Sequence, residues 1–306
     1  MSAPAHPLAE ILARETVVLD GGLSNQLAAQ GCDLSGALWS ARLLADAPGQ
    51  IEAAHTAYVR AGARVLVTAS YQATYEGFAR RGLGREETSE LLRRSVRLAR
   101  RAAGEREDVH VAASVGPYGA MLADGSEYRG RYGLSVRELE RFHRPRIEAL
   151  AEAGPDVFAL ETVPDADEAE ALLRAVGGTG IPVWLSYSVS GGATRAGQPL
   201  EAAFSLASGN DQVIAVGVNC CDPRDADRAV AIAAATTGKP VVVYPNSGET
   251  WDAAARDWRG AVTYDPESAS NWQAERARLI GGCCRVGPSR IAELADRMTT
   301  GGRGPG

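Results

Sequence analysis

Short runs of apolar, often β-branched residues alternate along the chain with longer stretches whose apolar positions repeat at helical spacing. Eight such runs predict strands at residues 16–20, 64–69, 109–114, 157–161, 183–188, 213–219, 240–244 and 279–281. Helices are predicted around them at residues 24–29, 49–61, 86–103, 136–152, 165–175, 200–208, 224–237 and 288–298. A regular alternation of strand and helix is typical of a parallel sheet covered by helices.

Eight strand–helix units favour one α/β domain, a single (β/α)8 TIM barrel over residues 10–298, rather than two separate domains. The alternative is a doubly wound open sheet, which seldom contains eight regular units. Two connections, residues 116–133 and 246–275, are long, and long loops in a compact domain commonly carry function. The glycine-rich residues 299–306 are predicted to form a disordered tail.

Composition narrows the classes of partner. The chain has 306 residues, of which 45% are hydrophobic and 23% charged, so it can bury a large core. Its net charge of -6 and the absence of a basic cluster argue against a nucleic-acid partner. No apolar run reaches the roughly 18 residues that span a bilayer, and the first residues lack a signal-peptide pattern. We therefore expect a cytoplasmic protein without a membrane partner; the oligomeric state is not readable from the sequence.

In a TIM barrel the active site is built where the strands end at their carboxyl side, so the residues that follow each predicted strand are the candidates. Polar and sulfur-bearing residues gather there unevenly. They include Asp20 with Gly21 and Gly22, Ser70 with Tyr71, Glu161, Asn219 with Cys220 and Cys221, and Cys283 with Cys284. The single lysine, Lys239, precedes the seventh strand and lies at the opposite end, which excludes Schiff-base aldolase chemistry.

Four of the five cysteines follow the sixth and eighth predicted strands, and only Cys32 lies elsewhere. These two strands are two positions apart around a closed barrel, so their ends can converge across its mouth and bring three thiolates together. Three thiolates with one open position form a catalytic zinc arrangement, because sulfur suits this ion and the vacancy admits a substrate ligand. The cysteines therefore predict a bound Zn²⁺.

The order of the cysteines constrains which of them can face inward. Neighbouring side chains on a strand alternate faces, so only one of Cys220 and Cys221 can point into the barrel, and the alternation alone leaves that choice open. Cys283 and Cys284 can both face inward if Gly281 and Gly282 let the backbone turn sharply. The four histidines lie off the strand ends and are predicted to be helix or surface residues. They are His6, His55, His110 and His143.

Several segments resemble the homocysteine S-methyltransferases, in particular the branch that uses S-methylmethionine. They are LDGGLSNQLAAQGCDL (19–34), LWSARLL (38–44), TASYQAT (68–74), SVGPYGAMLADGSEYRG (114–130), FHRPR (142–146), GVNC (217–220), VVVYPNSGE (241–249) and LIGGCCR (279–285). The resemblance covers residues 17–298. It implies a TIM barrel, and it implies zinc bound by Cys220, Cys283 and Cys284.

The resemblance also implies an activity, the transfer of a methyl group from S-methylmethionine to the thiol of L-homocysteine, which gives methionine. Asp20 and Glu161 would bind the homocysteine ammonium group, and the N–H groups of Gly21 and Gly22 are candidates for its carboxylate. Ser70 is a candidate for a contact to the amino acid, and Asn219 is a candidate for orienting groups near the site.

The donor is a cation, which an aromatic face binds well, so Trp39, Tyr71, Tyr118 and Tyr128 are candidates for the donor side. Alternative donors are S-adenosylmethionine and betaine, and a selenol such as selenocysteine is an alternative acceptor. A different class of protein, a zinc-binding barrel without catalysis, is also possible. An open zinc position beside paired acids favours the enzyme.

Overall fold

The computed structural model describes residues 4–36, 38–252 and 257–301. Eight parallel strands form one sheet in the order β1-β12-β9-β8-β5-β4-β3-β2. The two edge strands meet through a parallel bridge between Leu19 and Val65, and the Asp20 N–H donates to the Val65 carbonyl at 3.0 Å. The sheet therefore closes on itself, which confirms the (β/α)8 barrel and excludes the open sheet.

The strands follow the predicted positions, and four of the eight are shorter than predicted. They are β1 (Val17–Val18), β2 (Val65–Val67), β3 (His110–Val115), β4 (Val157–Val163), β5 (Val183–Tyr187), β8 (Val213–Asn219), β9 (Val241–Tyr244) and β12 (Ala277–Ile280). Two antiparallel hairpins lie outside the barrel, β6 (Val189–Ser190) with β7 (Ala193–Thr194), and β10 (Thr250–Asp252) with β11 (Asp257–Arg259).

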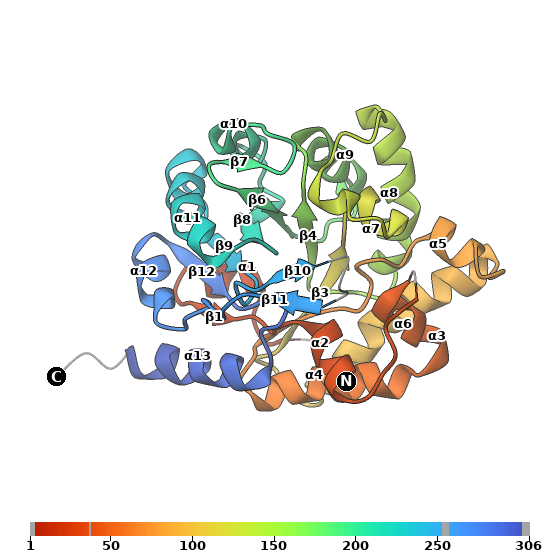
Figure 1. Cartoon of the computed structure of the whole chain (residues 1–306), viewed down its shortest axis with the longest axis horizontal. Coiled ribbons are helices and arrows are strands. Elements are labelled where there is room, and N and C mark those ends of the chain that lie inside the picture. The colour runs from red at the N-terminus through yellow and green to blue at the C-terminus, as the bar shows by residue number, and fades with distance from the viewer. Residues whose placement is uncertain (1–3, 37, 253–256, 302–306) are drawn as a thin grey trace.

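Helices surround the barrel (Figure 1). The longer ones are α4 (Pro48–Arg60), α6 (Arg85–Ala103), α8 (Val136–Ala151), α9 (Ala166–Val176), α11 (Pro223–Thr237) and α13 (Pro288–Gly301). The shorter ones are α1 (Leu8–Leu12), α2 (Leu23–Ala29), η1 (Trp39–Arg42), α3 (Leu43–Asp46), α5 (Tyr75–Ala79), α7 (Tyr118–Leu122), η2 (Ser126–Tyr128), α10 (Leu200–Ser205) and α12 (Ser268–Ala274). In the described part of the chain, none of them is long and apolar enough to cross a membrane.

Two expectations about these elements need correction. Helix α13 continues through Gly301, so residues 299–301 are helical and not part of a disordered tail, and residues 302–306 lie outside the described residues. The histidines were expected on helices or at the surface. His55 of α4 and His143 of α8 do lie on helices, with their side chains buried, whereas His110 begins β3 and is buried, so for His110 the expectation is wrong.

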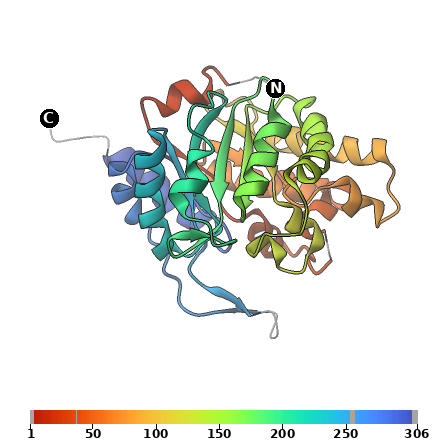
Figure 2. The ribbon, with the colours of Figure 1, turned by 90° about the horizontal axis from the view of Figure 1, so that it is seen from above.

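The core has two layers, separated by the barrel wall. The inner layer contains every second residue of several strands, for example Val157 and Ala159 of β4, while Phe158 and Leu160 pack outward against the helices. This is the alternation expected of a strand buried on both faces. Leu8 and Leu12 of α1 belong to the inner layer and so close the amino-terminal end of the barrel. In Figure 2, α1 and the β10–β11 hairpin lie at opposite ends of the molecule.

Candidate active site and metal centre

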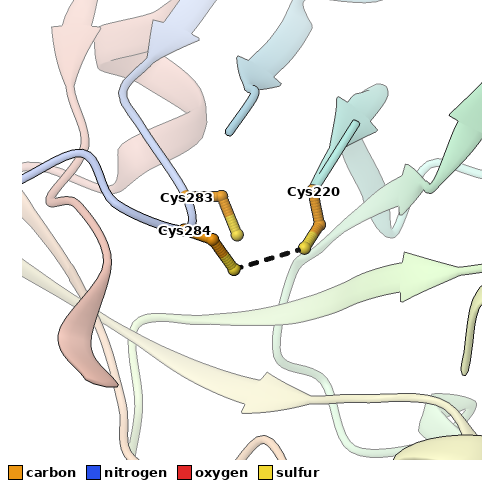
Figure 3. A group of neighbouring side chains, drawn as sticks. All are labelled: Cys220, Cys283 and Cys284. Carbon is orange, nitrogen blue, oxygen red and sulfur yellow. Dashed lines mark hydrogen bonds between the residues drawn. The ribbon is translucent and has the colours of Figure 1, made fainter. Parts of the chain in front are cut away.

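Three cysteine side chains converge at the carboxyl end of the barrel, from the ends of β8 and β12 (Figure 3). The sulfur atoms of Cys220, Cys283 and Cys284 all lie within 4.8 Å of one another, and those of Cys220 and Cys284 are 3.7 Å apart. Strand β9 separates the two strands in the sheet. The closed barrel therefore brings together the thiols that the chain order predicted.

Backbone N–H groups of the three cysteines donate hydrogen bonds that hold the two segments in place. The Cys220 N–H donates to the Tyr244 carbonyl at 3.2 Å, and the Cys283 N–H donates to the Pro245 carbonyl at 2.8 Å. The Cys284 N–H donates to Asn246 Oδ1 at 3.1 Å. Strand β12 has ended at Ile280, so strand alternation no longer applies and two consecutive cysteines can turn inward. A fixed backbone here fixes the directions of the sulfur atoms.

Glycine is required at this turn. A Cβ on Gly282 would lie 2.2 Å from Val286 Cγ1, which is closer than any side chain allows. At the other strand end, Cys220 has a φ of 51°, a left-handed conformation that non-glycine residues adopt rarely and at a cost. This turn directs Cys220 into the mouth while Cys221 remains fully buried in the outer core. The geometry thereby resolves the choice that alternation left open, in favour of Cys220.

The sulfur positions fit a zinc ion. Tetrahedral Zn–S bonds of about 2.3 Å place two sulfur atoms about 3.8 Å apart, close to the separation of Cys220 and Cys284. Sulfur hydrogen bonds from Cys283 and Cys284 lower the pKa of Cys220, and the contact with Cys220 raises the pKa of both other thiols. The protein alone therefore favours one thiolate, and a divalent cation would offset the repulsion among three.

A fourth group contacts this cluster. The hydroxyl of Tyr128, from η2, lies 3.1 Å from the Cys220 sulfur. The Arg195 guanidinium lies over the Tyr128 ring, 5.4 Å from its centre, and its Nε donates to Ser188 Oγ at 3.2 Å. The Ser188 hydroxyl in turn donates to the Cys220 carbonyl at 3.2 Å. Tyr128 is therefore linked to Cys220 directly through its hydroxyl and indirectly through Arg195 and Ser188.

Two carboxyl groups stand beside the cysteines. Asp20 follows β1 and accepts the Val67 N–H at 2.9 Å, and Glu161 of β4 accepts hydrogen bonds from Ser114 and, at 3.0 Å, from the Tyr244 hydroxyl. Burial raises the pKa of Asp20 well above its ordinary value, with a further contribution from Glu161. Burial likewise raises the pKa of Glu161 to about 7. A cationic ligand beside the two carboxyl groups would lower their pKa values again, because it stabilises the ionised carboxylates.

A cavity lies over the cysteines and the acids. Its walls include three aromatic residues that were donor-side candidates, Trp39, Tyr71 and Tyr128, together with Thr68, Thr162 and Tyr244. Among the described residues that line it, none is Lys, Arg or His. A cavity with two carboxyl groups, aromatic walls and no basic side chain suits ligands that carry positive charge.

Some predicted site residues lie elsewhere. The Ser70 hydroxyl donates to the Ser114 carbonyl at 2.7 Å, and neither Ser70 nor Asn219 lines the cavity. Tyr118 packs outside it, against Phe142 with ring centres 4.8 Å apart. The Gly22 N–H donates to the Val286 carbonyl at 2.9 Å, so it is engaged within the protein. Gly21 and Gly22 do line the cavity.

Asn219 does not line the cavity but orients backbone beside the site, within the expectation that it orients groups there. Its Oδ1 accepts the Thr162 N–H at 2.7 Å and the Ser186 hydroxyl at 2.8 Å, and its Nδ2 donates to Thr162 Oγ1 at 2.7 Å. Thr162 has a φ of 56°, which is unusual for a β-branched residue. Asn219 therefore holds the strained residue that follows Glu161. Strand alternation could have placed Asn219 inward, but nothing in the sequence indicates the turn at Thr162.

Comparisons with known proteins identify the family of the chain. Residues 17–298 match the family model described as homocysteine S-methyltransferase. Homocysteine S-methyltransferase 4 of Zea mays is 45% identical over 91% of this chain and 88% of its own. Selenocysteine Se-methyltransferase of Brassica oleracea is 38% identical over 92% of this chain and 89% of its own. The metallated form of the Escherichia coli homocysteine methyltransferase MmuM superposes with a TM-score of 0.86 at 41% identity, covering 95% of this chain and 100% of that one. The chain belongs to the homocysteine S-methyltransferase family and transfers a methyl group to homocysteine.

Proposed function

We propose that this enzyme takes its methyl group from S-methylmethionine and requires one zinc ion bound by Cys220, Cys283 and Cys284. The observation that carries the proposal is the juxtaposition of three sulfur atoms within 4.8 Å and a cavity with acidic and aromatic but no basic side chains. When bound, zinc supplies an open coordination position and stabilises a thiolate over a thiol at neutral pH.

The residues of the chain supply orientation. Asp20 and Glu161 accept hydrogen bonds from the ammonium group of homocysteine, which places its side chain toward the cysteines. Because both carboxyl groups are buried, their charge is little screened and discriminates strongly in favour of a cation. The backbone around Gly21 is our candidate for the substrate carboxylate.

The donor binds on the aromatic side. Trp39, Tyr71 and Tyr128 line the cavity, and a sulfonium is attracted to aromatic ring faces without forming a bond that must be broken later. The homocysteine sulfur attacks the methyl carbon, the C–S bond of the donor breaks, and its electron pair stays on the sulfur of the departing neutral methionine. No base is needed for the donor, so catalysis consists of alignment and thiolate formation.

A direct assay tests the donor. The purified, zinc-loaded protein is incubated with homocysteine and, separately, S-methylmethionine, S-adenosylmethionine or betaine, and methionine is measured. We expect the highest kcat/KM with S-methylmethionine. Faster turnover with either other donor refutes the proposed donor, and unchanged turnover after complete zinc removal refutes the metal requirement.

A selenol acceptor is a second candidate, favoured by the likeness to selenocysteine Se-methyltransferase of Brassica oleracea. A selenol is softer and more acidic than a thiol, so it would suit the same site of three cysteines and metal as an acceptor. Competition between homocysteine and selenocysteine for one pool of S-methylmethionine measures which acceptor this chain prefers.

A further inference from the structure

A second cluster of buried polar residues lies outside the cavity. Arg146 and His143 of α8 and Glu168 of α9 are exposed by only 1%, 0% and 0%. Two of the three belong to the FHRPR segment, residues 142–146, and none of them lines the cavity or enters the proposed reaction. Burying an arginine and a glutamate is costly unless each is paired, so we asked what these buried residues do for the structure around them.

The hydrogen-bond directions in the cluster can be assigned. Arg146 Nη2 lies 2.6 Å from His143 Nδ1, and a guanidinium has only donors, so Nδ1 is the acceptor. His143 Nε2 lies 2.9 Å from Glu168 Oε1 and therefore carries the hydrogen that Glu168 accepts. The imidazole is neutral, in agreement with burial and the neighbouring Arg146 holding the pKa of His143 well below its ordinary value. Donation thus runs from Arg146 through His143 to Glu168.

The same groups hold the start of the connection between β3 and α8, residues 116–133. Arg146 Nη2 donates to the Gly116 carbonyl, and Glu168 Oε1 accepts the Tyr118 N–H at 2.6 Å. A Cβ on Gly116 would lie 2.6 Å from Tyr71 Cδ2, so this residue is packed directly on the Tyr71 ring. The position of Gly116, and with it one face of Tyr71, depends on Arg146.

The end of the connection is held by the same pair of helices. The Arg131 N–H donates to Asp165 Oδ2 at 3.0 Å, and Asp165 caps α9 by accepting the Asp167 N–H. Figure 1 shows α7 beside α8 and α9. Between the two attachments lies η2, which places Tyr128 against Cys220. Residues 116–133 therefore carry one cavity tyrosine and support another.

We propose that Arg146, His143 and Glu168 are positioning residues, which set Tyr71 and Tyr128 on the donor side of the cavity and thereby determine the affinity for the methyl donor. This inference rests on the proposed function, in which these rings bind the sulfonium. Residues 116–133 contain five glycines, which are conformationally permissive, so attachments to neighbouring elements help to fix the shape of this segment. The three cysteines and the two acids lie on other elements, and residues 116–133 reach them through the Tyr128 hydroxyl alone among the contacts described above, so the affinities for homocysteine and zinc should change much less than the affinity for the donor.

The test is Arg146→Met in the zinc-loaded protein, with Arg144→Met as the matched control. Arg144 lies on the same helix but is partly exposed and pairs with Glu140. For Arg146→Met we expect the KM for S-methylmethionine to rise about tenfold. This is the change in affinity expected when the sulfonium loses its cation–π contacts with the rings of Tyr71 and Tyr128. The KM for homocysteine, the zinc content and kcat should change less than twofold. Arg146→Lys should recover part of the donor affinity, and Arg144→Met should match the wild type.

Amide hydrogen exchange gives a second readout that does not depend on the donor. Exchange should increase in residues 116–133 of Arg146→Met and stay unchanged in the strands. If both KM values rise together, or if exchange in residues 116–133 is unchanged, the inference is wrong. If Arg146→Met is insoluble, His143→Leu replaces it and should raise the donor KM about threefold; an unchanged donor KM then refutes the inference. If the wild type does not use S-methylmethionine, the proposed donor fails, and exchange alone decides the positioning role.

Discussion

Glu161, which we propose binds the ammonium group of homocysteine, should favour substrate binding at the expense of the stability of the fold. Its carboxyl is buried, and burial raises its pKa from the ordinary 4.5 to about 7. The replacement Glu161→Gln keeps an oxygen acceptor for Ser114 but removes the ionisable group. We expect this variant to bind homocysteine more weakly and yet to unfold at higher denaturant concentration in alkaline solution.

The size of the stability effect follows from the pKa. A shift of one unit corresponds to about 1.4 kcal/mol, so ionising Glu161 costs the ligand-free fold about 3 kcal/mol at most. Below the unfolded pKa the group is protonated in both states and costs nothing. As the pH rises from 4.5 toward 7, Glu161 loses its proton in the unfolded chain but keeps it in the folded protein. The free energy of unfolding therefore falls across this window and stays at the lower value above it.

The effect on binding has the opposite sign. A charged hydrogen bond to a buried carboxylate contributes about 1.5–3 kcal/mol, so Glu161→Gln should raise the Kd for homocysteine by roughly 10- to 100-fold. In the wild type, homocysteine affinity should fall as the pH drops below about 7, since the carboxylate becomes protonated. The variant should lack this part of the pH dependence.

The assay combines urea unfolding from pH 4.5 to 8.5 with homocysteine titration by calorimetry, using Glu170→Gln as the control. Glu170 is partly exposed, lies on α9 and pairs with Arg174. The stability difference between Glu161→Gln and wild type should grow from pH 4.5 to 7 and then remain constant. A variant that is less stable than wild type at pH 8.5, or one that binds homocysteine normally, would refute the reasoning.

Three further predictions concern the cysteines, the strained strand end and the lysine. Cys283→Ala should lose zinc, measured as metal per chain by elemental analysis, whereas Cys221→Ala should keep it because Cys221 lies in the core. Asn219→Ala leaves the Thr162 N–H without its acceptor and should lower the free energy of unfolding by about 2–4 kcal/mol in a urea titration. Lys239→Arg should leave methionine formation unchanged in the steady-state assay, since Lys239 Nζ donates to the carbonyl of a residue far from the site.

The barrel could be predicted from the sequence because its determinants are local. Each strand is a short apolar run, each long helix has a periodic apolar face, and eight repeats leave few arrangements. Helix α1 was missed because LAEIL spans only five residues, too few for a period to show. Its burial depends on the open end of the barrel, which exists only after the strands have closed.

The candidate site was predictable to the extent that it follows from chain order. Cysteines after the sixth and eighth strands were expected to be able to converge at the mouth, and the structure places them there. Because alternate residues of β4 face inward, Glu161 lies on the same face of the strand as Val157 and Ala159. Ser70 and Tyr118 follow strands that end at the same mouth, yet they do not line the cavity. Which side of the mouth a residue faces depends on turns beyond the strand, and these are fixed by long-range hydrogen bonds.

Two of the left-handed residues at the mouth, Thr162 and Cys220, show why those turns are maintained. Each non-glycine residue in this conformation costs about 1–2 kcal/mol, and Glu161 adds a cost when it ionises. Asn219 holds Thr162 through both its oxygen and its nitrogen, and the next residue is Cys220 itself. One short segment at the end of β8 therefore fixes the residue beside Glu161, the acid that we propose binds the ammonium group, and directs the sulfur of Cys220, which we propose binds zinc. If both proposals hold, the same backbone positions both ends of homocysteine, and relaxing the strain at either residue would misalign the thiol relative to the ammonium group.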